Sequence, residues 1–173
     1  AIHENDCECI KLGFEVKAID VGSKQTTIEF SNNNDIVSEA IIGCDGNRSI
    51  IRQCLHGDDS IKYLGYVAWR GLVPSSELPA SLIEPDTASY FGNGKIFARY
   101  KVRSGKLVNY VAFARKSDWI EEDWSIRSSL EEVMEEFSDA SAEIRTIIQK
   151  TPADECYKWA LVGRRPLNNW TYK

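Results

Sequence analysis

Hydrophobic and polar positions alternate with a period of two over much of the chain, which is the pattern of half-buried β-strands. In the first part of the chain the pattern predicts strands at residues 9–19 and 26–30, and a short buried strand at 39–44. Farther along it predicts four more strands, at 65–73, 88–91, 95–102 and 106–114. The glycine-containing break at 103–105 predicts that the last two pair as an antiparallel hairpin.

A helical spacing of apolar residues replaces this alternation in three places. Ile51 and Leu55 lie on one face of a helix that is expected to begin within three residues of Gly46. Ser128 and Glu131 form a capping-box pattern, which predicts the start of a second helix.

A third helix is predicted at 142–150, where isoleucines recur at helical spacing. Together the elements predict an α+β chain, with an α/β part first and a mainly antiparallel β-sheet part after it. The pattern changes near residue 62, which is the expected domain boundary.

Composition excludes several classes of function. A net charge of -5 and the lack of basic clusters argue against a nucleic-acid partner. The apolar runs are far shorter than the roughly 20 residues of a membrane span. The five cysteines and two histidines show no metal-ligand spacing, so we expect no metal site. We expect reduced thiols, and therefore an intracellular, cytoplasmic location.

The candidate chemistry lies in the sequence IIGCDGNRSIIR, which ends at Arg52. An apolar strand is expected to deliver Asp45 to its carboxyl end, and Gly46 allows backbone to approach a ligand closely. There the aspartate can accept a hydrogen bond from a ribose hydroxyl, while the helix N-terminus and Arg52 or Arg48 favour phosphate. The alternative is structural, because Asp-Gly is a common turn and Ser49 then caps the helix.

Three further side chains are candidates for a substrate pocket. Trp69 and Arg70 are successive residues of a predicted strand, so they face opposite sides. An indole in a strand is most often core material. Arg70 needs a partner, which is either an acidic substrate or a residue such as Glu77 or Asp86. Arg99 lies in another predicted strand and has the same two interpretations.

Four segments carry a family resemblance, and residues 26–43 resemble the lead-in to the fingerprint that follows them. The Asp-Gly pair at 45–46, with Ser49 and Arg52 after it, resembles the fingerprint of FAD-dependent aromatic-ring monooxygenases, the salicylate hydroxylase-like and para-hydroxybenzoate hydroxylase-like flavoproteins. Residues 63–79, YLGYVAWRGLVPSSELP, resemble the opening of their substrate domain. Residues 159–170, WALVGRRPLNNW, resemble the approach to their second flavin motif.

The resemblance implies a partial flavoprotein monooxygenase fold. Residues 1–62 would belong to an FAD-binding domain, 63–163 to a substrate-binding domain of antiparallel sheet with two helices, and 164–173 would return to the FAD-binding domain. It implies cofactor contacts, to FAD and NAD(P)H, by Asp45, Gly46, Ser49 and Arg52. The implied reaction is hydroxylation of an aromatic or similar electron-rich small molecule with O₂, through a flavin hydroperoxide. The resemblance assigns no catalytic residue.

The sequence also departs from the family pattern. It lacks the glycine-rich Gly-x-Gly-x-x-Gly turn and the second flavin motif, and it begins without methionine. We therefore expect an internal fragment that alone holds no FAD and is inactive. Two alternatives remain open: a non-catalytic ligand-binding or interaction module from a truncated or degenerate paralogue, and an FAD-dependent epoxidase or reductase of the same superfamily.

Overall fold

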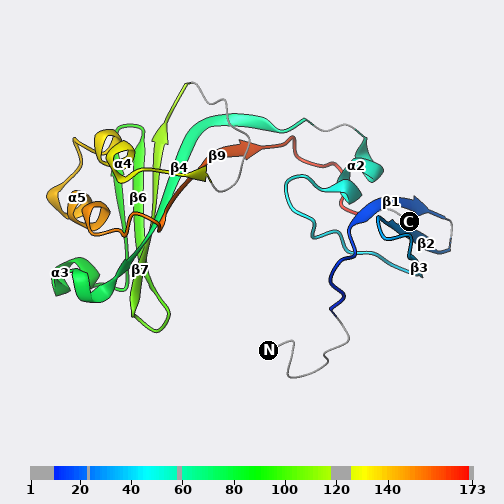
Figure 1. Cartoon of the computed structure of the whole chain (residues 1–173). Coiled ribbons are helices and arrows are strands. Elements are labelled where there is room, and N and C mark those ends of the chain that lie inside the picture. Colours follow the sequence, from blue (N-terminus) through cyan, green and yellow to red (C-terminus); the bar gives the residue numbers. More distant parts are fainter. Residues whose placement is uncertain (1–9, 23, 58–59, 118–125, 172–173) are drawn as a thin grey trace. The chain divides into compact units, whose positions relative to one another are not determined.

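The computed structural model describes residues 10–22, 24–57, 60–117 and 126–171, and Figure 1 shows the whole chain. The chain divides into two compact units. Unit 1 contains residues 1–61 and 164–173, and unit 2 contains residues 62–163. Most of the regular structure is antiparallel β-sheet with a few short helices, as the sequence pattern predicts.

The described residues of unit 1 form a three-stranded antiparallel sheet and one helix. The sheet has the order β1-β2-β3, with β1 at Val16–Val21, β2 at Thr26–Phe30 and β3 at Asp35–Ser38. The prediction for β2 is confirmed at both ends. β1 begins later than predicted, and β3, which follows the polar residues 31–34, was not among the predicted strands. Helix α2 spans Ile50–His56.

The predicted strand at 39–44 is wrong for this structure. These residues form no regular secondary structure, and Ile42 is 88% exposed. A β-strand requires a hydrogen-bonded neighbour, which an apolar sequence alone does not provide. The following helix begins at Ile50, four residues after Gly46 and one later than predicted.

Unit 2 is built on a six-stranded antiparallel sheet with the order β5-β6-β7-β4-β9-β8. Its strands are β4 (Lys62–Pro74), β5 (Thr87–Gly92), β6 (Lys95–Val102), β7 (Leu107–Arg115), β8 (Ile126–Arg127) and β9 (Cys156–Gly163). The predicted hairpin is confirmed, because Val102 of β6 pairs with Leu107 of β7. Neither β8 nor β9 was predicted.

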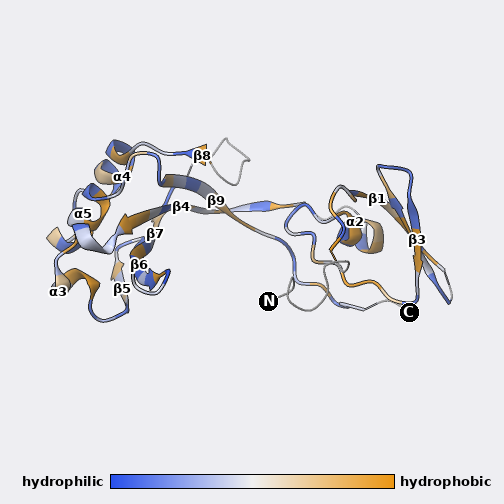
Figure 2. Cartoon of the chain, turned by 60° about the horizontal axis from the view of Figure 1, so that its bottom comes forward, coloured by the Kyte–Doolittle hydropathy of each residue, from blue (hydrophilic) through white to orange (hydrophobic). Residues whose placement is uncertain are grey.

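The helices of unit 2 all pack on one face of this sheet (Figure 1). After a 3₁₀ turn at Ser75–Glu77, they are α3 (Ala80–Ile83), α4 (Leu130–Glu136) and α5 (Ala142–Gln149). Helices α4 and α5 carry both hydrophobic and hydrophilic residues, as Figure 2 shows. Their apolar sides form one core with the sheet, and this core includes Trp69, Phe97, Tyr110, Phe137 and Ile147.

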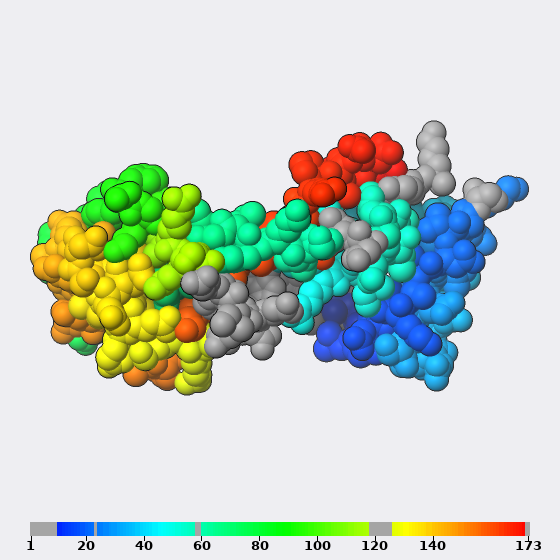
Figure 3. Space-filling view, turned by 90° about the horizontal axis from the view of Figure 1, so that it is seen from above, coloured from blue at the N-terminus to red at the C-terminus, as the bar shows by residue number. Residues whose placement is uncertain are grey.

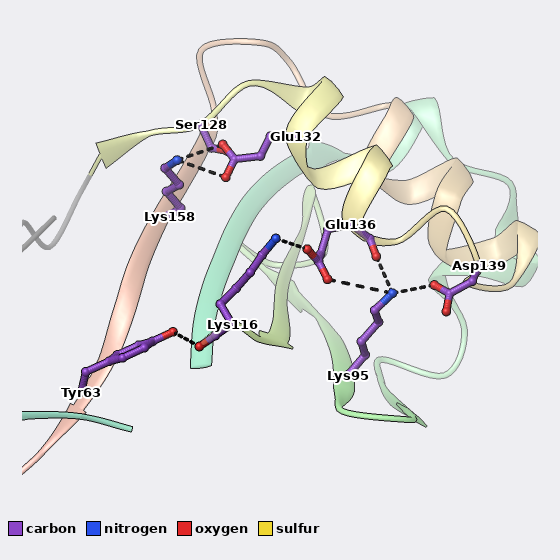
Figure 4. A network of polar contacts seen from close by, with 8 residues as sticks. All are labelled: Tyr63, Lys95, Lys116, Ser128, Glu132, Glu136, Asp139 and Lys158. Carbon is purple, nitrogen blue, oxygen red and sulfur yellow. Dashed lines mark hydrogen bonds and ion pairs between the residues drawn. The ribbon is translucent and has the colours of Figure 1, made fainter. Parts of the chain in front are cut away.

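Polar contacts fix α4 to the sheet, as Figure 4 shows. The N-cap of α4 is Ser129, one residue later than the predicted cap, and the Glu132 amide donates to the Ser129 hydroxyl at 3.2 Å. The Glu132 carboxylate accepts from Lys158 of β9 at 2.9 and 3.0 Å. At the other end of the helix, Lys95 of β6 donates to the Glu136 carbonyl at 2.5 Å. Helix α4 is thus held to the sheet at both ends.

Candidate functional site

The first candidate site is the loop between β3 and α2. Ser49 is the N-cap of the helix, and its hydroxyl accepts from the Arg52 amide at 2.9 Å. Gly46 has a φ of 76°, in the left-handed region that a side chain rarely adopts. No described atom lies within 4 Å of where its Cβ would stand, so the loop leaves open space there.

Asp45 is exposed, and both its carboxylate oxygens accept hydrogen bonds from the start of α2. The Ser49 hydroxyl donates to Oδ1 at 2.5 Å, and the Ile51 amide donates to Oδ2 at 3.1 Å. Although Asp45 is exposed, partial desolvation of its carboxylate acts to raise its pKa; these bonds and the amides of Asp45 and Ile50 outweigh that effect, so the pKa lies below its ordinary value. The side chain is therefore a carboxylate at neutral pH, with lone pairs left for another donor.

These contacts restrict what the helix N-terminus can offer a ligand. The amides of Ile51 and Arg52, which a phosphate would need, are already bonded to Asp45 and Ser49. Ser49 therefore caps the helix, as the structural interpretation of the sequence predicts. The carboxylate of Asp45, rather than the helix end, is the group that remains able to bind.

The C-terminal residues of unit 1 return to this loop, as Figure 3 shows for the red segment beside the cyan one. The Arg164 guanidinium donates to the Asn47 carbonyl. Arg52 donates from Nη2 to the Arg165 carbonyl at 3.2 Å. The two segments that resemble flavin motifs are thus in contact, and Arg52 has a structural partner within unit 1.

The second candidate site is the face of the six-stranded sheet opposite the helices, which we call the open face. One row of cross-strand neighbours on it is apolar and runs Phe91, Ile96, Phe113, Ala68 and Trp159. The next row runs Ser89, Ala98, Val111, Arg70, Tyr157 and Arg127. Neither row contains an acidic residue. The face is suited to a flat apolar molecule that carries a negative charge.

Trp69 and Arg99 lie on the helix-covered face. Trp69 is 0% exposed and packs edge-to-face against Phe137 of α4, with ring centroids 6.3 Å apart. Arg99 is 1% exposed and donates to the carbonyls of residues 83–85 at 2.8 to 3.2 Å. Both side chains are buried within unit 2, so the structure does not bring them together with Arg70 on the open face.

Arg70 is the pocket candidate that lies on the open face, where its side chain is exposed. Its Nε donates to Oδ1 of Asn109 at 2.9 Å. Neither Glu77 nor Asp86 is its partner, because each forms an ion pair with a lysine. Because successive side chains of β4 point to opposite faces of the sheet, Trp69 lies in the core and Arg70 lies on the open face.

The part of the chain that the structure describes contains no group of three or more histidine, cysteine or acidic residues that could hold a metal ion. No helix there has the length and hydropathy needed to cross a membrane. Cys44, Cys54 and Cys156 carry free thiols, whereas Cys7 and Cys9 lie outside the described residues.

Known proteins are similar to this chain in sequence and in fold. The 3-hydroxybenzoate 6-hydroxylase of Klebsiella oxytoca is 28% identical over 145 residues, which are 83% of this chain and 35% of that protein. The FAD-dependent monooxygenase orf3 of Aspergillus niger is 34% identical over 143 residues, 78% of this chain and 32% of that protein. The chain is a relative of the FAD-dependent aromatic-ring monooxygenases. No family model matches the sequence.

The chain spans about a third of the length of these two relatives. The solved structure of Klebsiella pneumoniae HpxO, complexed with FAD and uric acid, matches it with a TM-score of 0.81 and 19% identity. The match covers 96% of this chain and 42% of HpxO. The chain therefore has part of a flavoprotein monooxygenase fold.

The sequence pattern did not predict several residues of the open face of this chain. Asn109 is 1% exposed. An isolated amide in an otherwise apolar strand is the sequence feature that could have marked it as a candidate. Tyr157 and Trp159 were missed with their strand, although together with Leu161 they show the period of two. No local sequence pattern predicts the hydrogen bond between Arg70 and Asn109, because the two residues are 39 positions apart in the chain.

Proposed function

We propose that this chain is part of an FAD- and NAD(P)H-dependent monooxygenase that hydroxylates an aromatic or similar electron-rich ring. The observation that carries the proposal is the sequence relation to proteins named as such hydroxylases and monooxygenases, over 78% and 83% of the chain. The geometry of the two candidate sites supports it, one as a cofactor contact and one as a substrate surface.

The loop around Asp45 fits a flavin nucleotide. Its carboxylate is ionised at neutral pH and retains lone pairs, so it can accept a hydrogen bond from a ribose hydroxyl. The open space beside Gly46 allows the ligand to approach the backbone. Ser49 orients the carboxylate, and Arg52 holds the returning segment at Arg165. FAD bound there and reduced by NAD(P)H supplies the activation of O₂ and the transfer of one oxygen atom.

The open face of unit 2 fits the substrate ring. Its apolar row offers flat side chains for stacking and keeps water from the ring. Arg70 lies in the next row and provides a polar contact that fixes the orientation of a ring substituent. The proposed contribution of this chain to catalysis is therefore binding and orientation.

The test uses the full-length protein that contains this chain. It is expected to purify with bound FAD, to oxidise NADH or NADPH faster in the presence of a suitable aromatic compound, and to consume O₂. With isotope-labelled O₂, mass spectrometry should find one labelled oxygen atom in the ring product.

The alternatives predict different results. A protein that binds aromatic ligands but carries no flavin, even after incubation with FAD, would be the non-catalytic module. A flavoprotein that epoxidises or reduces its substrate without ring hydroxylation would be the epoxidase or reductase. Either result would contradict the proposed reaction.

A further inference from the structure

Strand β5 forms one edge of the six-stranded sheet of unit 2, because β6 is its partner on one side and no described strand pairs with its other side. Edge strands expose unpaired amides and carbonyls, and proteins usually protect them with charged residues, proline, bulges or a very short strand. β5 has none of these features. Its six residues, TASYFG, include no charge and no proline, and its register with β6 is unbroken. This edge is therefore able to pair with another strand.

The pairing with β6 identifies the hydrogen-bonding groups that β5 leaves open. The Lys101 amide donates to the Asp86 carbonyl at 3.0 Å, so these two opposed residues form a hydrogen-bonded pair. In an antiparallel ladder such pairs recur at every second residue. The amides and carbonyls of Thr87, Ser89 and Phe91 therefore point away from β6. All three residues are exposed, and none of these backbone groups bonds to another described residue.

The open groups of β5 are complementary to those of a second β5 strand. When two copies of the strand pair in antiparallel, Ser89 can lie opposite Ser89 of the second copy, and Thr87 opposite Phe91. In this register every open amide and carbonyl of β5 meets an open partner. Each Phe91 side chain, which is 79% exposed, then packs beside a threonine, and aromatic and β-branched side chains form favourable cross-strand pairs.

The charges beside β5 also fit an antiparallel pair. Glu84 and Asp86 precede the strand and form ion pairs with Lys101, whereas the residues that follow it, Asn93 and Gly94, are uncharged. Antiparallel pairing places the acidic end of each copy beside the uncharged end of the other. Like charges of the two copies therefore do not meet, although they would destabilise the pair if they lay opposite each other.

The links between the two units leave this edge free. They join unit 2 at the start of β4 and at the end of β9. The order of the sheet places β6 and β7 between β4 and β5. Neither link therefore runs along β5.

We propose that β5 is a dimer interface, at which two copies of this protein pair their β5 strands in antiparallel about a two-fold axis at Ser89. The two six-stranded sheets then form one continuous sheet. Opposed residues of a sheet point to the same side, so the open faces of the two copies lie on the same side of the joined sheet. This inference does not depend on the proposed function, because it uses only β5 and the residues beside it.

The first experiment measures the association state of the full-length protein by analytical ultracentrifugation at micromolar concentration. The natural protein should sediment as a dimer. Ser89→Pro removes the central amide donor, which does not bond to β6, and Ser89→Lys places two like charges opposite each other. Each variant should weaken the dimer at least about tenfold. Ser76→Lys, at an exposed serine of the 3₁₀ turn, is the matched control and should leave the dimer unchanged.

A cross-link tests the register of the pair. Opposed residues of a hydrogen-bonded antiparallel pair have Cα atoms about 5.5 Å apart, which is within the range that a disulfide spans. Mild oxidation of Ser89→Cys should therefore give a covalent dimer linked through position 89, which peptide mapping identifies. Ser76→Cys should give no such link through position 76. Thermal melts accompany every variant, and Ser89→Lys should fold even if Ser89→Pro does not, because Ser89 is exposed.

Three results would overturn the inference. The first is a natural protein that stays monomeric and gives no cross-link through position 89. The second is a dimer that neither Ser89→Pro nor Ser89→Lys weakens, because its interface would then lie elsewhere. The third is a monomer in which the amides of Thr87, Ser89 and Phe91 are protected from hydrogen exchange, because another segment of the same protein would then cover the edge.

Discussion

At the scale of single residues, Asp45 has a structural contact and a proposed binding contact on the same carboxylate. Its oxygens accept from Ser49 and from the Ile51 amide, which closes the start of α2. The remaining lone pairs are those proposed to meet the cofactor. Substitutions can separate the structural contribution of Asp45 from the proposed binding contribution, because Ser49 takes part in capping the helix but carries no charge.

Replacing Asp45 with Ala is expected to lower two quantities in the full-length protein. The free energy of unfolding should fall by about 1 kcal/mol, the usual value of a capping side chain. FAD affinity should fall about tenfold to a hundredfold, because a charge-assisted hydrogen bond is lost. Urea unfolding and FAD titration measure the two effects. Ser49→Ala is the control, and it should lower stability similarly with less effect on FAD. If FAD affinity stays within about twofold in both variants, Asp45 acts only as a cap.

The stability that Asp45 contributes should also depend on pH. Because its folded-state pKa is lowered from 3.8, the contribution is fully present above 3.8 and is lost as the pH falls through the folded-state value. The Asp45→Asn variant has no such titration. The difference in unfolding free energy between the natural protein and Asp45→Asn should therefore be constant between about pH 7 and about pH 5, and shrink below that. A difference that grows on acidification would contradict the assignment.

At the scale of helices and strands, local patterns predicted the elements whose partners are close in the sequence. The strand Lys95–Val102 was predicted at both ends, because alternation and the break at 103–105 both mark the hairpin. The segment 39–44 was predicted incorrectly, since its apolar residues resemble a buried strand but have no strand beside them. Pairing across the sheet, rather than composition, decides such cases.

The candidate sites were predictable to different degrees for the same reason. The sequence placed Trp69 and Arg70 on opposite sides of their strand, which the structure confirms. It could not tell which side the helices cover, because that depends on packing by residues such as Phe137, far along the chain. The contact of Arg70 with Asn109 depends on the register between β4 and β7, which no local pattern encodes.

Arg99 provides a prediction at this scale, because it joins β6 to the end of α3. Its guanidinium donates to three successive carbonyls, at residues 83–85, while it is 1% exposed. Arg99→Met should lower the free energy of unfolding by about 3 kcal/mol, because three carbonyls lose a charged donor that is itself buried. Denaturant unfolding measures it, with the exposed Arg127→Met as the control, which should change stability by about 0.5 kcal/mol at most. FAD affinity should be unchanged in folded Arg99→Met, and a changed FAD affinity would contradict the purely structural assignment of Arg99.

At the scale of the whole molecule, the division into two units should be visible in thiol chemistry. Cys44 and Cys54 are exposed in unit 1, whereas Cys156 is buried in unit 2. Burial raises the pKa of the Cys156 thiol; a hydrogen bond with Tyr110 opposes this and the charge of Glu132 adds to it.

Alkylation at neutral pH should therefore modify Cys44 and Cys54 in the folded protein, and Cys156 only when unit 2 unfolds. Peptide mapping by mass spectrometry at increasing urea concentrations measures this for each thiol. The continuous stretch 62–163, expressed alone, should protect Cys156 to the same extent, because its core residues all lie within it. Modification of Cys156 at the rate of Cys54 without urea would contradict the existence of an independent core.

The chain enters unit 2 at Lys62 and leaves it at Gly163, and these two residues are cross-strand partners in β4 and β9. Partners in an antiparallel ladder have Cα atoms about 5 Å apart, so the hundred residues between them begin and end at nearly the same point. A homologous unit grafted at this pair would leave the backbone path of unit 1 unchanged. Recombination at these two positions would therefore exchange the proposed substrate surface of unit 2 without altering the proposed cofactor loop of unit 1, so each can be inherited separately from the other.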